Sequence, residues 1–272
     1  MTRLNFNTVE APSVPLRMLF LSAYGGGKTY LIGYLSKRME ELTGKGIKLF
    51  DFDIGWQTLK SQGFNLDVTS YLVDPEHMGL AFDEFDDDFH QYLSDPAKYG
   101  GFAIDSLTTL QACTMSYVLS ENKVKRRTAG RFQMTDKNDF GVLVTMLMQI
   151  LPQILKISSH SVFCMTAHTR LQEDEMTGEK KILPAVSGKA LPSQLGSWFN
   201  EVWFLHSEGY KGDVQRFAQT MAGGQVDCKT QIACMPFDIP VIAAIEKSLI
   251  AYGINKEPTG EMLDFIAAAS KS

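Results

Sequence analysis

Residues 19–35 read LFLSAYGGGKTYLIGYL, and three glycines separate two apolar segments in this stretch. The first segment, residues 17–22, is a short apolar run that predicts a buried strand. The second, residues 30–43, repeats apolar residues at helical spacing with charged residues between them, which predicts an amphipathic helix. Glycine adopts backbone conformations that other residues avoid, so it suits a sharp turn between strand and helix. We expect that turn to wrap a phosphate group.

The glycines fit the end of the P-loop pattern GxxxxGK[ST], with Ser22 where the first glycine is expected. In such a loop the backbone N–H groups converge on phosphate oxygens at a helix N-terminus. Lys28 would reach the β- and γ-phosphates, and the hydroxyl of Thr29 would bind Mg²⁺. The alternative is a glycine-rich turn without a ligand. The predicted ATP-binding residues are Ala23, Tyr24, Gly25, Gly26, Gly27, Lys28, Thr29 and Tyr30.

Acidic residues follow two other predicted strands. Asp105 ends the apolar run 101–105. At that place its carboxylate would hold Mg²⁺ together with Thr29. Asp105 could also cap the following helix, and the two roles are compatible. Asp51 lies in the predicted strand 47–52 and Asp53 directly follows it, so the two would share one face if the chain stays extended. We expect Asp53 to orient the attacking water, with Asp51 as second candidate. His168, after the run 161–167, is a candidate γ-phosphate sensor or an ordinary polar residue.

Alternating strands and helices predict an α/β fold with a mainly parallel sheet. Further strands are expected over 202–206 and 214–220, and further helices over 107–119, 140–157 and 239–252. We expect an N-terminal arm over 1–16 and a single domain over 17–272. Two long polar loops, at about 121–138 and 171–189, interrupt that domain.

Composition excludes several classes of protein. The 272 residues are 44% apolar and 21% charged, and a net charge of −5 excludes a protein that coats nucleic acid by overall positive charge. The four cysteines have no CxxC spacing, which argues against a zinc or redox site and indicates reduced thiols. The acidic cluster 83–88 indicates a solvated helix face. With no signal peptide or membrane-length apolar run, we expect a cytoplasmic protein that uses no membrane.

The order of the motifs along the chain resembles that of the RecA-like ATPase core. These motifs are, in order, AYGGGKT, LFDFDIG, FAIDSLTTL, a basic loop, VFCMTAHTR and SGKALPSQLGSWFNEVWFL. The resemblance covers about residues 17–236 and is greatest to small phage nucleotide-binding ATPases, some of which act in single-strand annealing or recombination. It implies a RecA-like P-loop NTPase fold, a mainly parallel central sheet flanked by helices, with ATP and Mg²⁺ as ligands. It also implies that Asp53 activates water and that His168 links the nucleotide state to the DNA loops.

The same resemblance implies that the two long loops line an axis and hold single-stranded DNA. The first loop suits that role because basic groups and an aromatic ring bind a single strand without sequence preference, although a solvated loop has the same composition. The second loop mixes charges, so its carboxylates would meet a neighbouring subunit. A basic residue acting on the next subunit's γ-phosphate would be Lys229, or alternatively Arg216. The predicted DNA-binding residues are Lys123, Lys125, Arg126, Arg127, Arg131 and Phe132.

These features favour an ATP-dependent, oligomeric single-stranded-DNA-binding protein of the phage recombination or annealing type. It would hydrolyse ATP at subunit interfaces of a ring or filament, in the host cytoplasm, with a phage single-strand-binding protein as a further partner. Two alternatives remain open. One is a P-loop ATPase motor or helicase loader, and the other is a nucleotide-dependent binding module with little turnover.

Overall fold

The computed structural model describes residues 14–71, 78–121, 128–129, 132–156, 161–173, 178–188, 190–210 and 213–255. In these ranges nine strands form one sheet in the order β11-β10-β9-β1-β7-β4-β2-β3, with β8 paired to β7. The sheet strands are β1 (Leu16–Ser22), β2 (Ile47–Asp51), β3 (Asp67–Ser70), β4 (Gly101–Asp105), β7 (Val162–Glu173), β8 (Lys180–Pro184), β9 (Glu201–Tyr210), β10 (Asp213–Gln219) and β11 (Asp238–Pro240).

The five strands β1, β2, β3, β4 and β7 run parallel, and β9 joins them beside β1. β10, β11 and β8 are antiparallel to their neighbours. The expected mainly parallel α/β fold, with helices on the sheet, is therefore confirmed. Although β1 and β4 carry the P-loop and Asp105, they do not pair; β7 lies between them.

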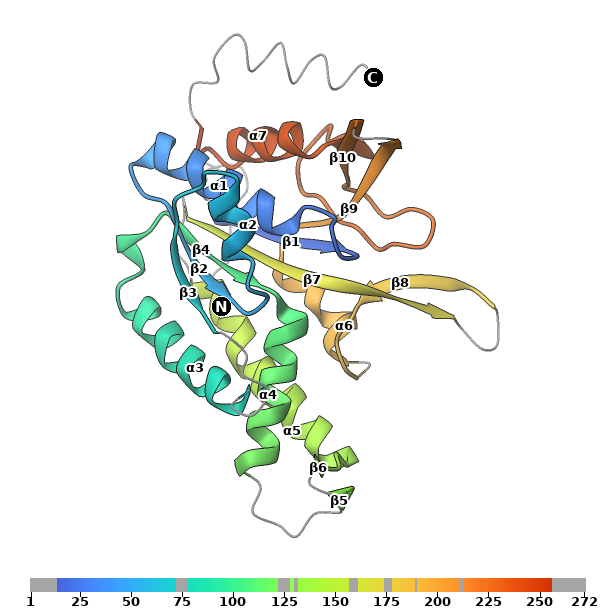
Figure 1. Ribbon diagram of the computed structural model, residues 1–272. Coiled ribbons are helices and arrows are strands. Elements are labelled where there is room, and N and C mark those ends of the chain that lie inside the picture. Colours follow the sequence, from blue (N-terminus) through green and yellow to red (C-terminus); the bar gives the residue numbers. More distant parts are fainter. Residues whose placement is uncertain are drawn as a thin grey trace, which may run out of the picture.

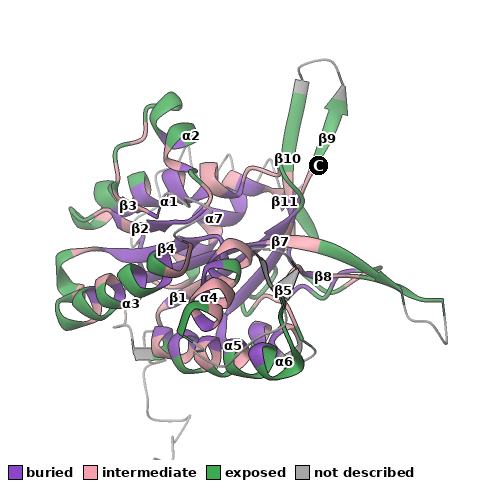
Figure 2. Cartoon of the chain, turned by 60° about the horizontal axis from the view of Figure 1, so that its bottom comes forward, coloured by how far each residue is buried: buried purple, intermediate pink, exposed green. Residues whose placement is uncertain are grey.

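Helices cover both faces of the sheet (Figures 1 and 2). One face is covered by α1 (Lys28–Thr43), α2 (Trp56–Ser61) and α7 (Val241–Ala251). The other is covered by α3 (Met78–Ser94), α4 (Leu107–Glu121), α5 (Lys137–Ile150), α6 (Ala190–Leu195) and the short helices η2 (Leu151–Lys156) and η3 (Gly196–Trp198). The remaining short elements are η1 (Pro96–Lys98), β5 (Thr128–Ala129) and β6 (Phe132–Gln133).

The alternation of side chains along β1 explains why it lies at the centre. Met18 and Phe20 are buried against the face of α1 and α7, whereas Leu19 and Leu21 are buried against the opposite layer. A strand that is apolar on both faces must be covered on both sides, as expected for a parallel sheet. Full burial of each large side chain contributes about 1.5–3 kcal/mol to folding.

Two expected loops contain strands. Part of residues 171–189 forms an antiparallel ribbon, because β7 continues to Glu173 and pairs with β8 (Figure 1). Residues 128–129 and 132–133 pair as a short hairpin before α5. The polar residues of these two segments predicted loops. Strand formation depends on backbone pairing with another segment, and the sequence of one segment does not show that pairing.

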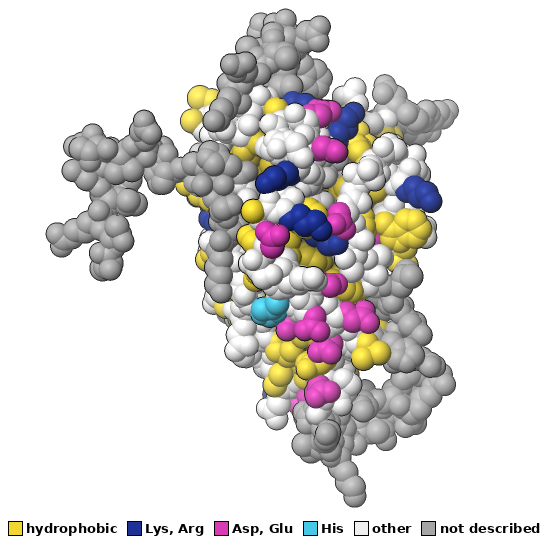
Figure 3. Space-filling view, turned by 90° about the vertical axis from the view of Figure 1, so that its left-hand side faces the viewer, with side chains coloured by type: hydrophobic (Ala, Val, Ile, Leu, Met, Phe, Trp, Pro, Cys, Tyr) yellow, Lys and Arg dark blue, Asp and Glu magenta, His cyan; other side chains and the backbone are white. Residues whose placement is uncertain are grey.

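Two helices bear on the expectations from composition. The exposed side of α3 carries the predicted acidic cluster, and Figure 3 shows Asp and Glu side chains gathered in the lower half of that side of the molecule. Among the described residues one helical stretch, Lys137–Leu155, is long and apolar enough by composition to cross a membrane. Its residues Leu143, Leu147 and Ile154 are fully buried in the protein core.

Candidate nucleotide-binding site

The site lies at the carboxyl ends of β1, β7, β4 and β2. Strand register brings its residues together: Ser22 at the end of β1 pairs with His168 on β7, and Asp51 at the end of β2 pairs with Asp105 on β4. Ligands of open α/β sheets bind at this edge because the connecting loops converge there. The loop residues that follow β1 and β2 therefore face a common space.

The P-loop after β1 accommodates serine in place of the first glycine. Ser22 is buried, and its hydroxyl donates a hydrogen bond to the Ala23 carbonyl at 2.8 Å. A Cβ atom on Gly26 would lie 2.3 Å from Ser22 Oγ, so Gly26 leaves the space that the serine side chain fills. Gly27, at φ 87°, directly precedes α1. Serine in place of the first glycine of the pattern is therefore compatible with a glycine loop that leads directly into a helix.

Lys28 is only 6% exposed, and its ammonium group points back into the loop. Nζ lies 3.0 Å from Ser22 Oγ, 3.3 Å from the Ser22 carbonyl, 3.1 Å from the Ala23 carbonyl and 3.3 Å from His168 Nδ1. Burial lowers the pKa of Lys28, and Asp105 and Asp53 partly offset that effect. A buried ammonium with only uncharged hydrogen-bond partners in the described structure is suited to an anionic ligand.

Thr29 and Asp105 form an oxygen pair beside the loop. Thr29 Oγ1 donates to Asp105 Oδ2 at 2.5 Å, and Thr166 donates to the other carboxylate oxygen. Burial raises the pKa of Asp105 to about 6. A Cβ atom on Gly55 would lie 3.0 Å from Asp105 Oδ2, so this glycine lets the loop after β2 approach closely. A hydroxyl and a carboxylate at one point fit the preference of Mg²⁺ for oxygen ligands.

Asp51 and Asp53 have different environments. β2 ends at Asp51, so the extended conformation that would place both carboxylates on one strand face does not persist to Asp53. Asp51 is fully buried and accepts hydrogen bonds from the backbone N–H groups of Asp53, Gly55 and Trp56, at 3.1, 2.9 and 3.0 Å. Asp51 therefore organises the loop, whereas Asp53 lines the cavity.

His168 connects Asp53 to Lys28. Its Nε2 lies 3.2 Å from Asp53 Oδ2, and its Nδ1 faces the Lys28 ammonium. An ammonium only donates, so Nδ1 accepts and the proton resides on Nε2, which donates to Asp53. Burial alone would raise the pKa of Asp53, but hydrogen bonds from His168, Thr109 and Ser106 lower it overall. Asp53 is thus held as a carboxylate.

The cavity around these groups has a volume of about 770 Å³, within the range of small-molecule sites. The predicted ATP-binding stretch lines it from Tyr24 to Tyr30, and Asp53, Asp105 and His168 line it too. The Tyr24 ring lies against the His168 ring, with 4.2 Å between centroids. Thr109 and Arg216 are further lining residues that sequence reasoning did not place in this cavity. The sequence did contain a signal for Thr109, because this residue lies in the first turn of the helix that follows Asp105.

Other predicted residues lie elsewhere. Lys229 is not among the residues that line the cavity of its own chain, and its Nζ donates to the carbonyl groups of Phe199 at 2.8 Å and Gly196 at 3.4 Å. Lys123, Lys125, Arg126, Arg127 and Arg131 lie outside the described residues. Phe132 begins β6, but its side chain is likewise outside the description.

All four cysteines are free thiols, in agreement with the composition. Cys113, Cys164 and Cys228 are buried, and burial raises the pKa of the Cys113 thiol to about 11 and that of Cys228 to about 12. Cys234 is exposed. Such buried thiols are unreactive at neutral pH, so they contribute to packing.

Comparison with known proteins places this geometry in a family. A family model described as an AAA domain matches residues 15–232. The flagellar accessory protein FlaH from Methanocaldococcus jannaschii aligns with a TM-score of 0.46 and 9% identity, covering 83% of this chain and 85% of that chain. A KaiC-like protein from Pyrococcus horikoshii OT3 aligns with a TM-score of 0.45 and 12% identity, covering 83% and 84%.

No curated protein matches the chain. The family model nevertheless spans most of the sequence, from the start of β1 to beyond β10. The P-loop, its buried lysine and the carboxylate opposite Thr29 all fall within the matched residues. A match of this extent shows that the chain belongs to the AAA domain family, and the cavity at the end of β1 is that of a P-loop ATPase.

Proposed function

We propose that this protein binds ATP with Mg²⁺ in the 770 Å³ cavity and hydrolyses it as an oligomeric, single-stranded-DNA-binding protein of the phage recombination or annealing type. One observation carries the ATPase part of the proposal. The buried ammonium of Lys28, the Thr29–Asp105 pair and the His168–Asp53 pair surround one cavity. Each pair suits a different part of the reaction.

In this proposal the amides of the glycine loop and Lys28 hold the phosphates, in place of the uncharged groups that Lys28 contacts now. Thr29 and Asp105 would hold Mg²⁺, which neutralises charge on the phosphate oxygens. Asp53 orients the attacking water and takes its proton as the water oxygen bonds to the γ-phosphorus and ADP leaves. Each carboxylate oxygen has two lone pairs, so Asp53 can accept a hydrogen bond from water while it keeps the hydrogen bonds from His168 and Thr109.

In this proposal helix α4 connects the nucleotide site to the DNA-binding segment. Thr109 at its start donates to Asp53, and the neighbouring Thr108 hydroxyl accepts from the His168 backbone N–H at 3.0 Å. The helix ends at Glu121, immediately before the basic segment with Lys123, Lys125, Arg126 and Arg127. A 15-residue helix spans about 22 Å, so a shift at the nucleotide reaches that segment through a rigid element.

A DNA-stimulated ATPase assay tests the proposal. We expect single-stranded DNA to raise the hydrolysis rate and Lys28→Ala to abolish ATP binding. Replacing Arg126 and Arg127 by alanine should weaken DNA binding and reduce the slope of log affinity against log salt by about 1.4, for two lost phosphate contacts. The matched control is Lys37→Ala with Lys98→Ala, two exposed lysines that lie outside both predicted DNA loops.

The outcomes separate the alternatives. Equal DNA affinity in the arginine variant and the control would remove the basic segment from the function. Directional unwinding of a duplex would favour a motor or helicase loader. Tight ATP binding without turnover would favour a nucleotide-dependent binding module.

A further inference from the structure

Arg216 on β10 packs directly onto the P-loop of its own chain. A Cβ atom on Gly27 would lie 2.7 Å from Arg216 Cδ and 2.9 Å from its Nε. Gly27 at φ 87° is the residue that immediately precedes α1. The absence of a side chain at Gly27 therefore makes room for the arginine stem as well as for the turn.

Strand register fixes the direction of Arg216. In the β9–β10 pair, Arg216 faces Ser207 and the adjacent Phe217 faces His206, so these two pairs lie on opposite faces of the sheet. Ala218, two residues beyond Arg216, is buried in the core with residues of α1 and α7. Arg216 is thus on the face of β10 that turns towards α1.

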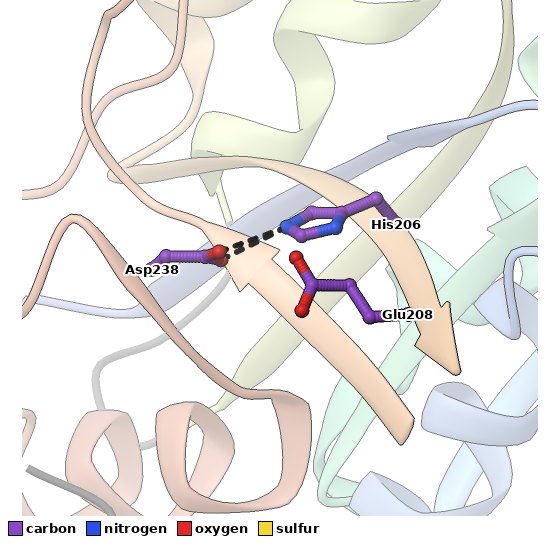
Figure 4. Close-up of side chains that lie close together, drawn as sticks. All are labelled: His206, Glu208 and Asp238. Carbon is purple, nitrogen blue, oxygen red and sulfur yellow. Dashed lines mark hydrogen bonds and ion pairs between the residues drawn. The ribbon is translucent and has the colours of Figure 1, made fainter. Parts of the chain in front are cut away.

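On the opposite face of the sheet, a cluster of polar side chains connects β9 and β11 (Figure 4). His206 Nε2 lies 3.0 and 3.1 Å from the two carboxylate oxygens of Asp238 on β11, with Glu208 beside them. The His206 ring also stacks on Phe217 at 5.8 Å. These contacts join β9, β10 and β11, so β10 is held in place on the face away from the P-loop.

The guanidinium group of Arg216 has no partner of its own in the described part of the chain. It makes no hydrogen bond or ion pair there, yet it lines the same cavity as Lys28, Asp53 and Asp105. Guanidinium groups bind phosphate oxygens through two parallel hydrogen bonds. An unpaired guanidinium at the edge of a phosphate loop has the chemistry to bind a polyphosphate.

We propose that Arg216 binds the polyphosphate of the nucleotide held by its own subunit, and that β10 is therefore part of the nucleotide site in cis. This inference rests on the proposed ATP site and deepens it. It replaces the alternative role that sequence similarity implied for Arg216, an action on the next subunit. Nucleotide binding would then hold the β9–β10 hairpin against the P-loop.

The first test measures binding of ATP and ADP by titration calorimetry. We expect Arg216→Ala to weaken both nucleotides by about 10- to 100-fold, and Arg216→Lys to retain part of the affinity. Arg170→Ala is the matched control, because Arg170 is also exposed but lines a different cavity. Arg216 is exposed and contacts the P-loop at its surface, not in the hydrophobic core, so the Tm without nucleotide should change little.

The second test separates cis from trans by mixing Arg216→Ala with Lys28→Ala subunits. An arginine that acts on the neighbouring subunit would be supplied by the Lys28→Ala chain, and ATP hydrolysis would return. A cis arginine predicts no gain on mixing. Restored hydrolysis, or wild-type affinity in Arg216→Ala, overturns the inference while the ATP site stands. Absence of ATP binding by the wild-type chain overturns the proposed function and this inference together.

Discussion

The ammonium group of Lys28 shows how single residues prepare this site. It is almost fully buried, and the described groups that contact it are two carbonyls, a hydroxyl and an imidazole nitrogen. Such contacts only partly replace water around a full charge. Phosphate oxygens are better partners, so nucleotide binding gains free energy from the exchange. Ser22 supplies two of these contacts, which explains how a serine serves in the position of a glycine.

The contact between Ser22 and Gly26 leads to a residue-scale prediction. Gly26→Ala places Cβ within 2.3 Å of Ser22 Oγ, so the P-loop must shift and ATP affinity should fall at least about 10-fold. Adding Ser22→Gly removes the clash and should restore most of the affinity. Ser22→Gly alone serves as the control and should stay within a few-fold of wild type. A double variant as weak as Gly26→Ala would show that the clash is not the cause.

At the scale of elements, the loop between β2 and α2 depends on the carboxylate of Asp51. That group accepts three backbone hydrogen bonds in a fully buried place, although burial raises its pKa. The loop in turn presents Asp53 to the cavity and brings Gly55 against Asp105. One acidic residue therefore shapes the loop, and the other is available for chemistry.

This division of roles predicts different effects for two similar substitutions. Asp51→Asn replaces an acceptor oxygen with a donor and should lower the free energy of unfolding by about 1–3 kcal/mol, or Tm by several degrees. Asp53→Asn should lower Tm less than Asp51→Asn does, because Asp53 is partly exposed in the cavity, and should abolish ATP hydrolysis, because the amide cannot accept a proton. Thermal unfolding and single-turnover hydrolysis measure the two effects. A stable Asp51→Asn protein would contradict the structural role.

At the scale of the whole molecule, a polar clamp joins the first and last described helices. Glu246 on α7 is buried and accepts from Arg38 Nε at 2.7 Å and from the Tyr34 hydroxyl at 2.6 Å, both on α1. Because α1 starts at the P-loop, this clamp anchors the helix whose N-terminus faces the cavity. The contact joins residues more than 200 positions apart in the chain.

Removing one partner of this clamp should cost more than removing both. Arg38→Ala leaves a buried carboxylate without its cation and should lower the free energy of unfolding by about 3 kcal/mol. The double variant Arg38→Met with Glu246→Leu replaces the pair by apolar groups and should lose much less. Urea unfolding at neutral pH measures both. Equal losses in the single and double variants would indicate that packing, and not the unpaired charge, determines the cost.

The sequence by itself determined the local units of this protein. The apolar runs of β1 and β4, the helical spacing of α1 and the glycines before Lys28 need only neighbouring residues to specify them, and all are found. The proximity of Thr29 and Asp105, which we propose as Mg²⁺ ligands, followed from motifs with a fixed place at the end of a strand, and the structure brings their side chains together. These predictions succeeded because their physical causes act within a few residues.

The tertiary structure alone decided what depends on strand order and register. The position of β7 between β1 and β4 places His168 between Lys28 and Asp53, and no local pattern specifies that order. The end of β2 at Asp51 separated the roles of Asp51 and Asp53. The β9–β10 pairing brought Arg216 to Gly27, nearly 190 residues away in sequence. Contacts of such separation arise from packing of the whole sheet, which a single segment of sequence does not encode.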